Sequence, residues 1–490
     1  MSDAIIVAKE LQLAHSSTLG PVQFHGDSMR PFLRDGDELV VERVAWEAIQ
    51  VGDILSYRLD DRFPTCRVVA KRGGKMVLKA DNWPTKSFQV WPEDIIGRVV
   101  VRRRAGQLLH LADSRWTLAT RLVLERGRLF ARAARVRARA QRTMADARKR
   151  WIRARHGYAE LPVAVQINVS RPCNLHCQMC PYLDLHADER RTRYMSLETF
   201  ERLLPLAALV QRMHFSGSGE PTLNKDLTRF MRLVRERYPK KPIELTTNGT
   251  RLDERLAREL IELRVYKLHV SIDGVNPETV QAIRRNVDFS KVKSNLERLR
   301  DLKRQMGSAS PIVMANYMTG LGTYAEIVEF VRFAREMGIA EIQLLEMQPR
   351  VRSDVENNLL SNLERDGGRV LKDAVKLAES YGIQIHLPLT ARNVCYFPYA
   401  PHIGEDGEVY ACCFIDYNGR QLYSEGREVQ MPGISFGNAA RDGFKAVWES
   451  PAYVELRARN VRGDFPDYCR SCYLARIGTS EKVRELFQLN

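Results

Sequence analysis

The sequence predicts an α/β protein whose central part is a partial barrel of six strand–helix units. Between residues 163 and 346, apolar stretches of strand length alternate with amphipathic stretches of helix length. This alternation is typical of a parallel sheet covered by helices. Six units give a partial TIM-like (β/α)6 barrel, in which ligands gather where the strands end. A small N-terminal all-β domain is expected before the barrel, and a cysteine-bearing extension after it.

The alternation assigns each element of the barrel in turn. Strands are expected near residues 163–169, 210–215, 242–246, 266–272, 311–317 and 341–346. Helices are expected near residues 197–208, 224–237, 252–263, 277–305 and 323–337. The motifs described next follow the first four strands directly, so we expect them to meet at the edge of the sheet where the strands end.

Three cysteines follow the first strand. Cys173, Cys177 and Cys180 form a C-x3-C-x2-C pattern. A cubic 4Fe-4S cluster ordinarily has four cysteine ligands, so a loop that offers three leaves one iron open to a non-protein ligand. The same triplet is also compatible with a zinc knuckle completed by His176 or by a distant fourth ligand.

A glycine-rich turn follows the second strand. It contains Gly217, Gly219 and Glu220 in the run Ser-Gly-Ser-Gly-Glu-Pro. Glycines allow the backbone to approach a ligand closely, and a glutamate carboxylate accepts hydrogen bonds from a ligand ammonium. This turn is therefore a candidate binding site for the polar end of a small molecule.

Two further turns follow the third and fourth strands. Asn248 lies in a Thr-Thr-Asn-Gly turn, and Ser271 and Asp273 lie in a Ser-Ile-Asp-Gly turn. A single Asn-Gly or Ser-x-Asp-Gly sequence usually marks only a change of chain direction. Here both occur at strand ends, in series with the cysteine triplet and the glycine-rich turn, and this order makes a common ligand site the better interpretation.

In this order, the four motifs resemble the radical S-adenosylmethionine (radical SAM) superfamily. In that family, the methionine amine and carboxylate of the cofactor chelate the open iron of a 4Fe-4S cluster. The resemblance implies that Glu220 binds the amine, that Gly217, Gly219 and Asn248 border the cofactor, and that Ser271 and Asp273 bind its ribose. The family turn is normally Gly-Gly-Glu-Pro, and Ser218 replaces its middle glycine here.

The resemblance also implies the reaction. A reduced cluster on the three cysteines would cleave S-adenosylmethionine, and the resulting 5′-deoxyadenosyl radical would remove a hydrogen atom from a substrate. The cofactor performs the difficult step, while the barrel orients the substrate and excludes water. An electron donor such as flavodoxin or ferredoxin is the partner that this chemistry implies.

A second cysteine group follows the barrel. Cys395 and Cys412 have the spacing C-x11-G-x4-C, and Cys469 and Cys472 form a later C-x2-C pair. This series resembles the SPASM/Twitch extensions of radical SAM enzymes, which implies that the four cysteines hold one auxiliary 4Fe-4S cluster. A structural zinc site with four cysteines has a compatible spacing. Cys413 is not expected to be a ligand, because neighbouring side chains on a strand point to opposite faces.

Residues 20–100 resemble a different family, the signal-peptidase and LexA-type serine peptidases. The run Phe24-His-Gly-Asp-Ser-Met-Arg-Pro carries Ser28, which would be the nucleophile. The resemblance implies a lysine or histidine base directly before an Arg-Val pair, but this chain has Cys66 there. Lys71 lies too far along the strand to replace that base. Because a serine without a base is a weak nucleophile, we expect a peptide-binding domain with lost or altered peptidase activity.

The charge of the chain is concentrated in one segment. The net charge is +16, and the segment 115–155 holds thirteen arginines and one lysine against one glutamate and one aspartate. The segment lacks proline and should be a basic helical linker. It is expected to be solvated, with a membrane surface or an acidic partner as alternatives ahead of nucleic acid.

Four domains are therefore expected: residues 1–105, 106–158, 159–360 and 361–490. No stretch of the sequence has the length of apolar residues that a transmembrane helix needs. A signal peptide is not evident, and the cysteine triplet requires reducing conditions, so a cytoplasmic location is expected.

The function expected from these patterns is oxidative modification of a peptide or protein side chain by a radical SAM enzyme. The SPASM-like extension resembles those of peptide maturases, and a peptidase-like domain would supply affinity for a peptide. One alternative is dehydrogenation of a small molecule such as an aminocyclitol or a sugar. Another is a processing serine protease in which Ser28 is active and the iron–sulfur half senses redox state.

Overall fold

The computed structural model describes residues 18–111, 125, 143, 160–180 and 193–487, except 26–27, 31, 59–62, 73, 83–87, 321, 347–351, 357, 389–394, 396, 417–419 and 425. The chain divides into two compact units, residues 1–148 with 376–382 and residues 149–375 with 383–490. The predicted barrel and the predicted extension, apart from residues 376–382, thus fall in one unit. The arginine-rich segment 115–155 lies outside the described residues except for Glu125 and Thr143, so its helix and its partners stay predictions, as do the four domain boundaries.

The first unit is built on an antiparallel sheet with the strand order β1-β2-β7-β3-β4-β5-β6, in which β8 pairs with β7. The strands are β1 Thr18–Gln23, β2 Glu38–Glu42, β3 Ile54–Tyr57, β4 Thr65–Arg72, β5 Lys75–Lys79, β6 Phe88–Val90, β7 Ile95–Arg104 and β8 Gln107–His110. Burial alternates along β2 and β5, and the buried side chains, among them Phe24, Leu39 and Met76, form one apolar core. The predicted N-terminal all-β domain is confirmed.

The second unit contains a nine-stranded sheet with the order β17-β16-β15-β13-β12-β11-β9-β18-β19. The strands are β9 Val165–Ile167, β11 Met213–Phe215, β12 Ile243–Thr247, β13 Lys267–Ser271, β15 Ile312–Thr319, β16 Glu341–Glu346, β17 Gln384–His386, β18 His402–Ile403 and β19 Val409–Tyr410. Every neighbouring pair is parallel except β18 and β19. The predicted α/β fold is confirmed, and β17 adds a parallel strand that the sequence did not indicate.

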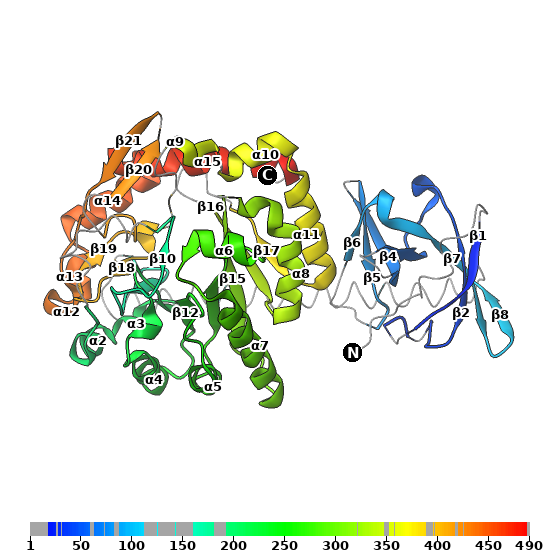
Figure 1. Cartoon of the computed structure of the whole chain (residues 1–490), viewed down its shortest axis with the longest axis horizontal. Helices are drawn as coiled ribbons and strands as arrows, with labels where there is room; N and C mark the ends of the chain where they lie inside the picture. Colours follow the sequence, from blue (N-terminus) through cyan, green and yellow to red (C-terminus); the bar gives the residue numbers. More distant parts are fainter. Residues whose placement is uncertain are drawn as a thin grey trace. The chain divides into compact units, whose positions relative to one another are not determined.

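Helices connect the parallel strands. They are α2 Leu197–Leu203, α3 Leu206–Leu209, α4 Leu227–Arg237, α5 Glu254–Glu262, α6 Pro277–Ile283, α7 Phe289–Gln305 and α8 Ile327–Met337. Figure 1 shows α4, α5, α7 and α8 along the outer side of the strands. Each of these helices buries one apolar stripe, as Leu256 and Leu260 do on α5. Covered in this way, the strands leave their carboxyl ends free for a site.

The prediction of one helix over residues 277–305 is wrong. Helix α6 ends at Ile283, and α7 begins only at Phe289, because the short strand β14, Arg284–Arg285, pairs with β10, His176–Cys177. Asp288 then caps α7 by accepting a hydrogen bond from the backbone of Lys291. The strand pairing brings the chain back to the cysteine loop, a long-range contact that local periodicity does not reveal.

The C-terminal extension follows the barrel sheet, and its residues 376–382 group with the first unit. Its remaining elements are α9 Arg352–Glu356, α10 Leu359–Asp366, α11 Arg369–Tyr381, β20 Arg420–Ser424, β21 Arg427–Met431, α12 Ala439–Asp442, α13 Phe444–Trp448, α14 Pro451–Arg462 and α15 Asp467–Phe487. Trp448 is fully buried, and the guanidinium of Arg457 lies 3.8 Å from the centroid of its ring. The indole of Trp448 also donates a hydrogen bond to the carbonyl oxygen of Glu160, which ties the extension to the entry of the barrel.

A buried ion pair joins the first barrel strand to the extension. Strand β18 pairs in parallel with β9, and just beyond it the Glu405 carboxylate lies 2.7 Å from Nε of Arg171. Asn168 donates a further hydrogen bond to Glu405 at 3.3 Å. Burial raises the pKa of Glu405, while the charge of Arg171 lowers it. The pair therefore holds the segment that precedes the cysteine triplet against the extension.

We predict that Glu405→Ala lowers the midpoint of thermal unfolding of the second unit markedly. The substitution removes the Glu405 carboxylate from a buried ion pair with Arg171, and removal of one partner of such a pair costs about 3–5 kcal/mol in comparable cases. The control is Glu198→Ala, which removes an exposed ion pair with Arg202 and should cost less than about 1 kcal/mol. Equal midpoints for the two variants, measured by circular dichroism, would contradict the role assigned to the buried pair.

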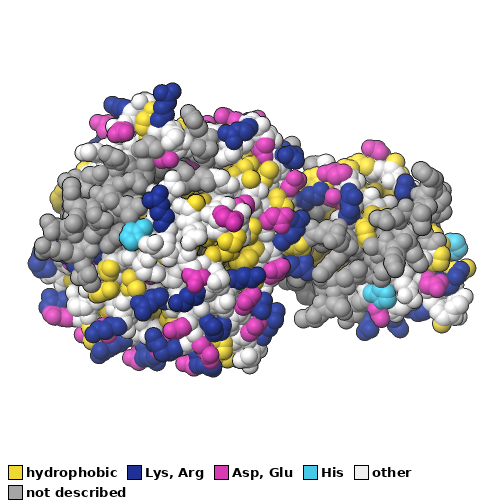
Figure 2. All heavy atoms as spheres, in the orientation of Figure 1, with side chains coloured by type: hydrophobic (Ala, Val, Ile, Leu, Met, Phe, Trp, Pro, Cys, Tyr) yellow, Lys and Arg dark blue, Asp and Glu magenta, His cyan; other side chains and the backbone are white. Residues whose placement is uncertain are grey.

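The surface of the second unit carries charges of both signs. Figure 2 shows Lys and Arg side chains interspersed with Asp and Glu over its helix-bearing side. Some charged side chains on the helices of this unit form i,i+4 pairs, such as Arg258 with Glu254. None of the described helices combines the length and apolar character that crossing a membrane requires.

Candidate functional site

A cavity of about 330 Å³ lies where the parallel strands end. Its wall combines residues of the cysteine loop, the glycine-rich turn, the strand ends and the extension: Cys173, Leu175, Cys177, Met179, Cys180, Gly217, Ser218, Gly219, Glu220, Pro221, Thr246, Thr247, Asn248, Ser271, Arg284, Met318, Glu346, Cys413, Phe414 and Leu422. Every barrel residue predicted to hold the cluster or the cofactor lines this cavity except Asp273. Motifs separated by about a hundred residues in the sequence thus form one site.

The three cysteines of the loop are close enough to influence one another. Burial, with contributions from the neighbouring Cys180 and Cys177 thiols, raises the pKa of the Cys173 thiol to about 12. Burial also raises the pKa of Cys177, against the lowering effect of Arg284. Since the thiolate is the form that binds a metal, three thiolates here require a positively charged group, and an iron cluster supplies that charge.

The arrangement does not fit a single zinc ion. In tetrahedral zinc sites with Zn–S bonds of about 2.3 Å, the sulfurs lie within about 4 Å of one another. Among the described residues, the one group of three His, Cys, Asp or Glu side chains whose ligand atoms all lie within 4.8 Å contains no cysteine. His176, the alternative fourth ligand, is exposed, and its Nδ1 lies 2.7 Å from Nδ2 of Asn286. The wider spread of the thiols fits a cubane, whose ligands bind different irons.

The glycine-rich turn packs directly on the segment that leads to the cysteines. A Cβ atom on Gly217 would lie 2.2 Å from Oδ1 of Asn168, and one on Gly219 would lie 2.3 Å from the carbonyl oxygen of Ser170. The backbone N–H of Glu220 donates to the carbonyl oxygen of Pro172 at 3.0 Å. The two glycines are therefore required by contact between two protein segments, in addition to any contact with a ligand.

Ser218, which replaces a glycine of the family pattern, has a partner of its own. Its hydroxyl donates to a carboxylate oxygen of Asp416 at 2.6 Å. Asp416 belongs to the extension, is buried, and lies 3.5 Å from Nε2 of His402. Serine in place of glycine at position 218 thus restricts the backbone but adds a hydrogen bond between the turn and the extension.

Glu220 is the most completely positioned side chain of the cavity. Its Oε1 accepts hydrogen bonds from the backbone and hydroxyl of Thr222 and from the hydroxyl of Thr247, and its Oε2 accepts from the backbone of Asn248 at 2.8 Å. Burial raises the pKa of this carboxyl, and the four hydrogen bonds oppose the shift. Because Oε2 accepts only one of these bonds, it retains the capacity to accept from a ligand ammonium.

The other predicted cofactor residues differ in their placement. Asn248 lines the cavity, and its amide donates to Oδ1 of Asn174 in the cysteine loop at 3.0 Å. Ser271 lines the cavity at the end of β13. Asp273 is fully buried, accepts from the backbone of Met318 at 2.7 Å and lies 2.6 Å from Arg284. A contact between Asp273 and the ribose stays a prediction, and within the protein Asp273 binds Arg284 and the backbone of Met318.

Arg284 is a residue of the cavity that the sequence did not single out. Its side chain is 12% exposed, pairs with Asp273, and donates from Nη1 toward Sγ of Cys177 at 3.7 Å. Burial alone would lower the pKa of Arg284, but Asp273 and Cys177 raise it, so the side chain remains a cation. In the sequence, the helical periodicity breaks at Asn286 and Asp288, and this break would have indicated that Arg284 lies outside a helix.

The four cysteines of the extension also influence one another. Burial raises the pKa of Cys412 well above its ordinary value, and the Cys413, Cys469 and Cys472 thiols raise it further. Burial likewise raises the pKa of Cys469 to about 12, with Cys472 and Cys395 contributing. Cys412 and Cys413 follow β19 in a turn, so the strand argument for their opposite directions is wrong. Cys413 nevertheless lines the cavity of the first cysteine group.

The first unit places the predicted peptidase residues inside its fold. Ser28 is only 4% exposed, and Cys66 lies buried on β4 opposite Leu55 of β3. The ammonium of Lys71 donates to the carbonyl oxygen of Trp46 at 2.6 Å and lies over the ring of that residue. Lys71 is therefore engaged elsewhere, and a base for Ser28 is not evident among the described residues.

Comparison with known proteins finds a family match for three segments of the chain. Residues 167–334 match the radical SAM superfamily, residues 395–473 match the SPASM iron–sulfur cluster-binding domain, and residues 2–100 match the peptidase S24-like family. The chain thus contains a radical SAM domain, an SPASM domain and an N-terminal peptidase S24-like domain. A radical SAM domain implies a 4Fe-4S cluster and S-adenosylmethionine, and an SPASM domain implies auxiliary iron–sulfur clusters.

Two curated relatives and two solved structures illustrate the range of similar proteins. A tungsten-containing aldehyde ferredoxin oxidoreductase cofactor-modifying protein of Pyrococcus furiosus is 27% identical over 63% of this chain and 86% of its own length. A probable GTP 3′,8-cyclase of Methanocaldococcus jannaschii is 28% identical over 38% of this chain and 59% of its own length. The chain thus spans less than two thirds of that cyclase.

The solved structures are more distant. Native anSMEcpe with bound AdoMet has a TM-score of 0.49 at 18% identity, covering 67% of this chain and 99% of its own. Streptococcus suis SuiB bound to the precursor peptide SuiA has a TM-score of 0.47 at 16% identity, covering 73% of this chain and 76% of its own. Likeness at this level does not bear on the substrate.

We predict that Glu220→Gln weakens binding of S-adenosylmethionine about tenfold to a hundredfold. The substitution keeps the shape but replaces a charged acceptor, and hydrogen bonds to charged groups contribute about 1.5–3 kcal/mol. Anaerobic calorimetric titration measures the affinity, and iron analysis shows that the cluster is retained. The control Glu254→Gln changes an exposed residue on α5 and should bind as the wild type does. An unchanged affinity of Glu220→Gln would remove this carboxylate from the cofactor site.

Proposed function

We propose that this chain oxidatively modifies a side chain of a peptide or protein by radical SAM chemistry. One observation carries the proposal: the cavity that holds the three cysteines and Glu220 is also lined by Cys413 and Phe414 of the extension. A substrate in this cavity would therefore contact both the barrel and the SPASM domain. That position suits a reaction in which the substrate loses a hydrogen atom and an electron.

The barrel residues have distinct roles in this proposal. Cys173, Cys177 and Cys180 would hold the 4Fe-4S cluster, and Arg284 would offset part of the negative charge of its thiolates. When bound, the cluster and S-adenosylmethionine together supply a 5′-deoxyadenosyl radical that removes a hydrogen atom from the substrate. Gly217, Gly219, Asn248 and Ser271 would border the cofactor, and Glu220 would accept from its ammonium. Asp273 would position Arg284 and the backbone of Met318.

The extension would hold an auxiliary 4Fe-4S cluster on Cys395, Cys412, Cys469 and Cys472. Their mutual effect on pKa supports a common site. Asn460 fixes the backbone of Cys395 by accepting from its N–H and donating to its carbonyl oxygen. Such a set of four ligands leaves no iron open, which suits electron transfer rather than binding of a second cofactor.

The peptidase S24-like domain supports a peptide substrate. Its buried Ser28, and a Lys71 that is engaged by Trp46, do not favour hydrolysis. A groove that has lost the base of its nucleophile can still bind an extended peptide, because binding by strand addition uses backbone hydrogen bonds. The domain would then deliver the peptide, and an electron donor such as flavodoxin or ferredoxin would serve the radical SAM domain.

Modification of a small molecule or a cofactor is the second candidate function. Its support is the similarity to the cofactor-modifying protein of Pyrococcus furiosus and to the GTP 3′,8-cyclase. In that case the N-terminal domain would have no part in substrate capture. The two candidates therefore differ in what the first unit does.

Iron content provides the first test. We predict that anaerobically reconstituted protein carries about eight irons, as two cubanes. Replacing Cys173, Cys177 and Cys180 by Ala should leave about four irons and abolish formation of 5′-deoxyadenosine. Replacing Cys469 and Cys472 by Ala should also leave about four irons, but cleavage of the cofactor should persist. Cys413→Ser is the matched control and should keep both clusters. Loss of both clusters in either set would show that the two sites are not independent.

The substrate provides the second test. We predict that deletion of residues 1–105 raises the KM for the substrate peptide at least tenfold but preserves uncoupled formation of 5′-deoxyadenosine, because the residues expected to hold the cluster and the cofactor all lie in the second unit. The control Ser28→Ala should keep both the KM and the turnover of the full chain. An unchanged KM after the deletion would favour the small-molecule candidate, and peptide cleavage that Ser28→Ala abolishes would favour a protease.

A further inference from the structure

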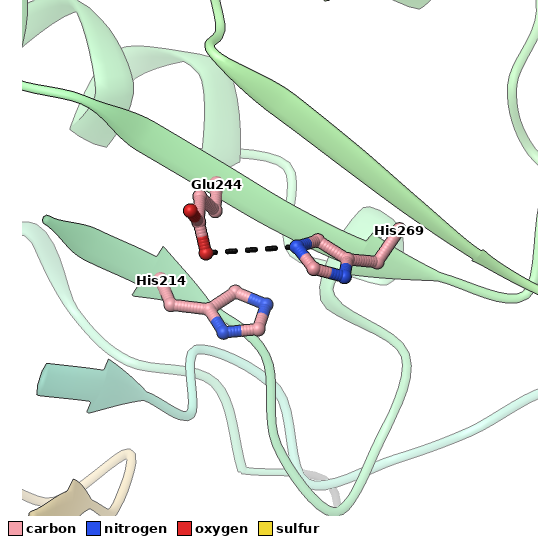
Figure 3. Close-up of side chains that lie close together, drawn as sticks. All are labelled: His214, Glu244 and His269. Carbon is pink, nitrogen blue, oxygen red and sulfur yellow. Dashed lines mark ion pairs between the residues drawn. The ribbon is translucent and has the colours of Figure 1, made fainter. Parts of the chain in front are cut away.

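Three side chains form a second cluster on neighbouring strands of the barrel sheet. His214 of β11, Glu244 of β12 and His269 of β13 each offer one ligand atom, and these atoms all lie within 4.8 Å of one another. None of the three lines the cavity. Figure 3 shows the Glu244 carboxylate beside both imidazole rings.

The register of the strands explains why the three side chains meet. His214 is the direct partner of Glu244, and His269 is the partner of Thr246 two residues further along β12. Residues two apart on a strand share a face, so all three side chains and Thr246 project from one face of the sheet. Thr246 also lines the cavity, which places the cluster one step before the strand ends.

The cluster contains a buried nitrogen whose hydrogen bonding is incomplete. Nε2 of His269 lies 3.5 Å from Oε2 of Glu244, which is beyond ordinary hydrogen-bond length, and it has no hydrogen-bond partner among the described residues. Leaving a buried polar atom unsatisfied costs about 1–3 kcal/mol. Arg212 approaches Glu244 to 3.8 Å, but its side chain is 46% exposed and can turn to solvent. A cation between the rings and the carboxylate would satisfy the nitrogen.

The second histidine, His214, can also offer a ring nitrogen to a metal ion. Its Nε2 lies 2.8 Å from the hydroxyl of Thr246, and in the tautomer that donates to this hydroxyl its Nδ1 is left as an acceptor. Histidines that bind metals commonly donate their second ring nitrogen to an oxygen in this way.

We propose that His214, Glu244 and His269 bind one divalent transition-metal ion, for which zinc is the ion that their donor set favours. Two imidazole nitrogens and one carboxylate oxygen form a ligand set known from zinc sites, whereas magnesium and calcium favour oxygen ligands alone. With zinc–nitrogen distances of about 2.0–2.1 Å, the three ligand atoms would move to about 3.4 Å from one another. The ion would join three strands beneath the cavity and fix Thr246 through His214.

Metal analysis of the full chain tests the site. Tag-free protein with reconstituted clusters is incubated with zinc chloride and desalted, and zinc and iron are measured by plasma mass spectrometry. The wild type should retain about one zinc per chain that His214→Ala and His269→Ala lose, with iron content unchanged. His386→Ala is the matched control, because His386 also contacts a carboxylate, Glu341, on the same sheet but without a second imidazole; it should retain the zinc.

Zinc X-ray absorption on the wild type gives a result that does not depend on the folding of a variant. Ligation by nitrogen and oxygen alone is the expected result. Zinc with sulfur ligands would assign it to the cysteine groups and overturn the proposal. Absence of retained zinc in the wild type would overturn it as well, as would retention of zinc by both folded variants, His214→Ala and His269→Ala, with wild-type circular dichroism.

Discussion

The site depends on the close contact between the glycine-rich turn and the segment before the cysteines. Gly217 and Gly219 touch Asn168 and Ser170 so closely that a Cβ atom at either glycine would overlap an oxygen. This contact places Glu220 beside the cysteine loop, where the threonines at 222 and 247 and the backbone of Asn248 orient its carboxylate. A residue larger than glycine would separate the acceptor for the cofactor from the ligands for the cluster.

The same segment also connects the barrel to the extension. Asn168 contacts Gly217 on one side and Glu405 on the other, and Arg171 forms a buried ion pair with Glu405. The bond from Ser218 to Asp416 adds a second link between the turn and the extension. Buried charged and polar contacts of this kind have demanding geometry, so the glycine-rich turn and the segment before the cysteines are held in a defined relation to the extension.

Polar side chains continue beneath the cavity on the inner strands. His214, Glu244 and His269 occupy positions where a barrel core would ordinarily have branched apolar residues. Thr246 belongs to both the cavity wall and the hydrogen bond with His214. A change at His214, Glu244 or His269 can therefore alter the cavity wall through the hydroxyl group of Thr246.

The sequence by itself determined the α/β class, the place of the barrel strands along the chain, and the cysteine and cofactor motifs whose residues line the cavity. It could do so because parallel strands bring motifs at their carboxyl ends to one edge, whatever the exact bounds of the helices. The motifs at Cys173, Glu220 and Asn248 are each local in the chain, and their separate patterns were enough to place them together.

Tertiary structure alone decided the contacts between segments that have no shared local pattern. Arg284 reaches Cys177 because β14 pairs with β10 and interrupts a region with helical periodicity. Asp273 is held by Arg284 rather than exposed to the cavity. The metal-binding cluster around His214 arises from strand register, which sets the face of each residue but leaves no motif in the sequence. Periodicity reports which residues are buried, whereas register and long-range pairing decide which buried residues meet.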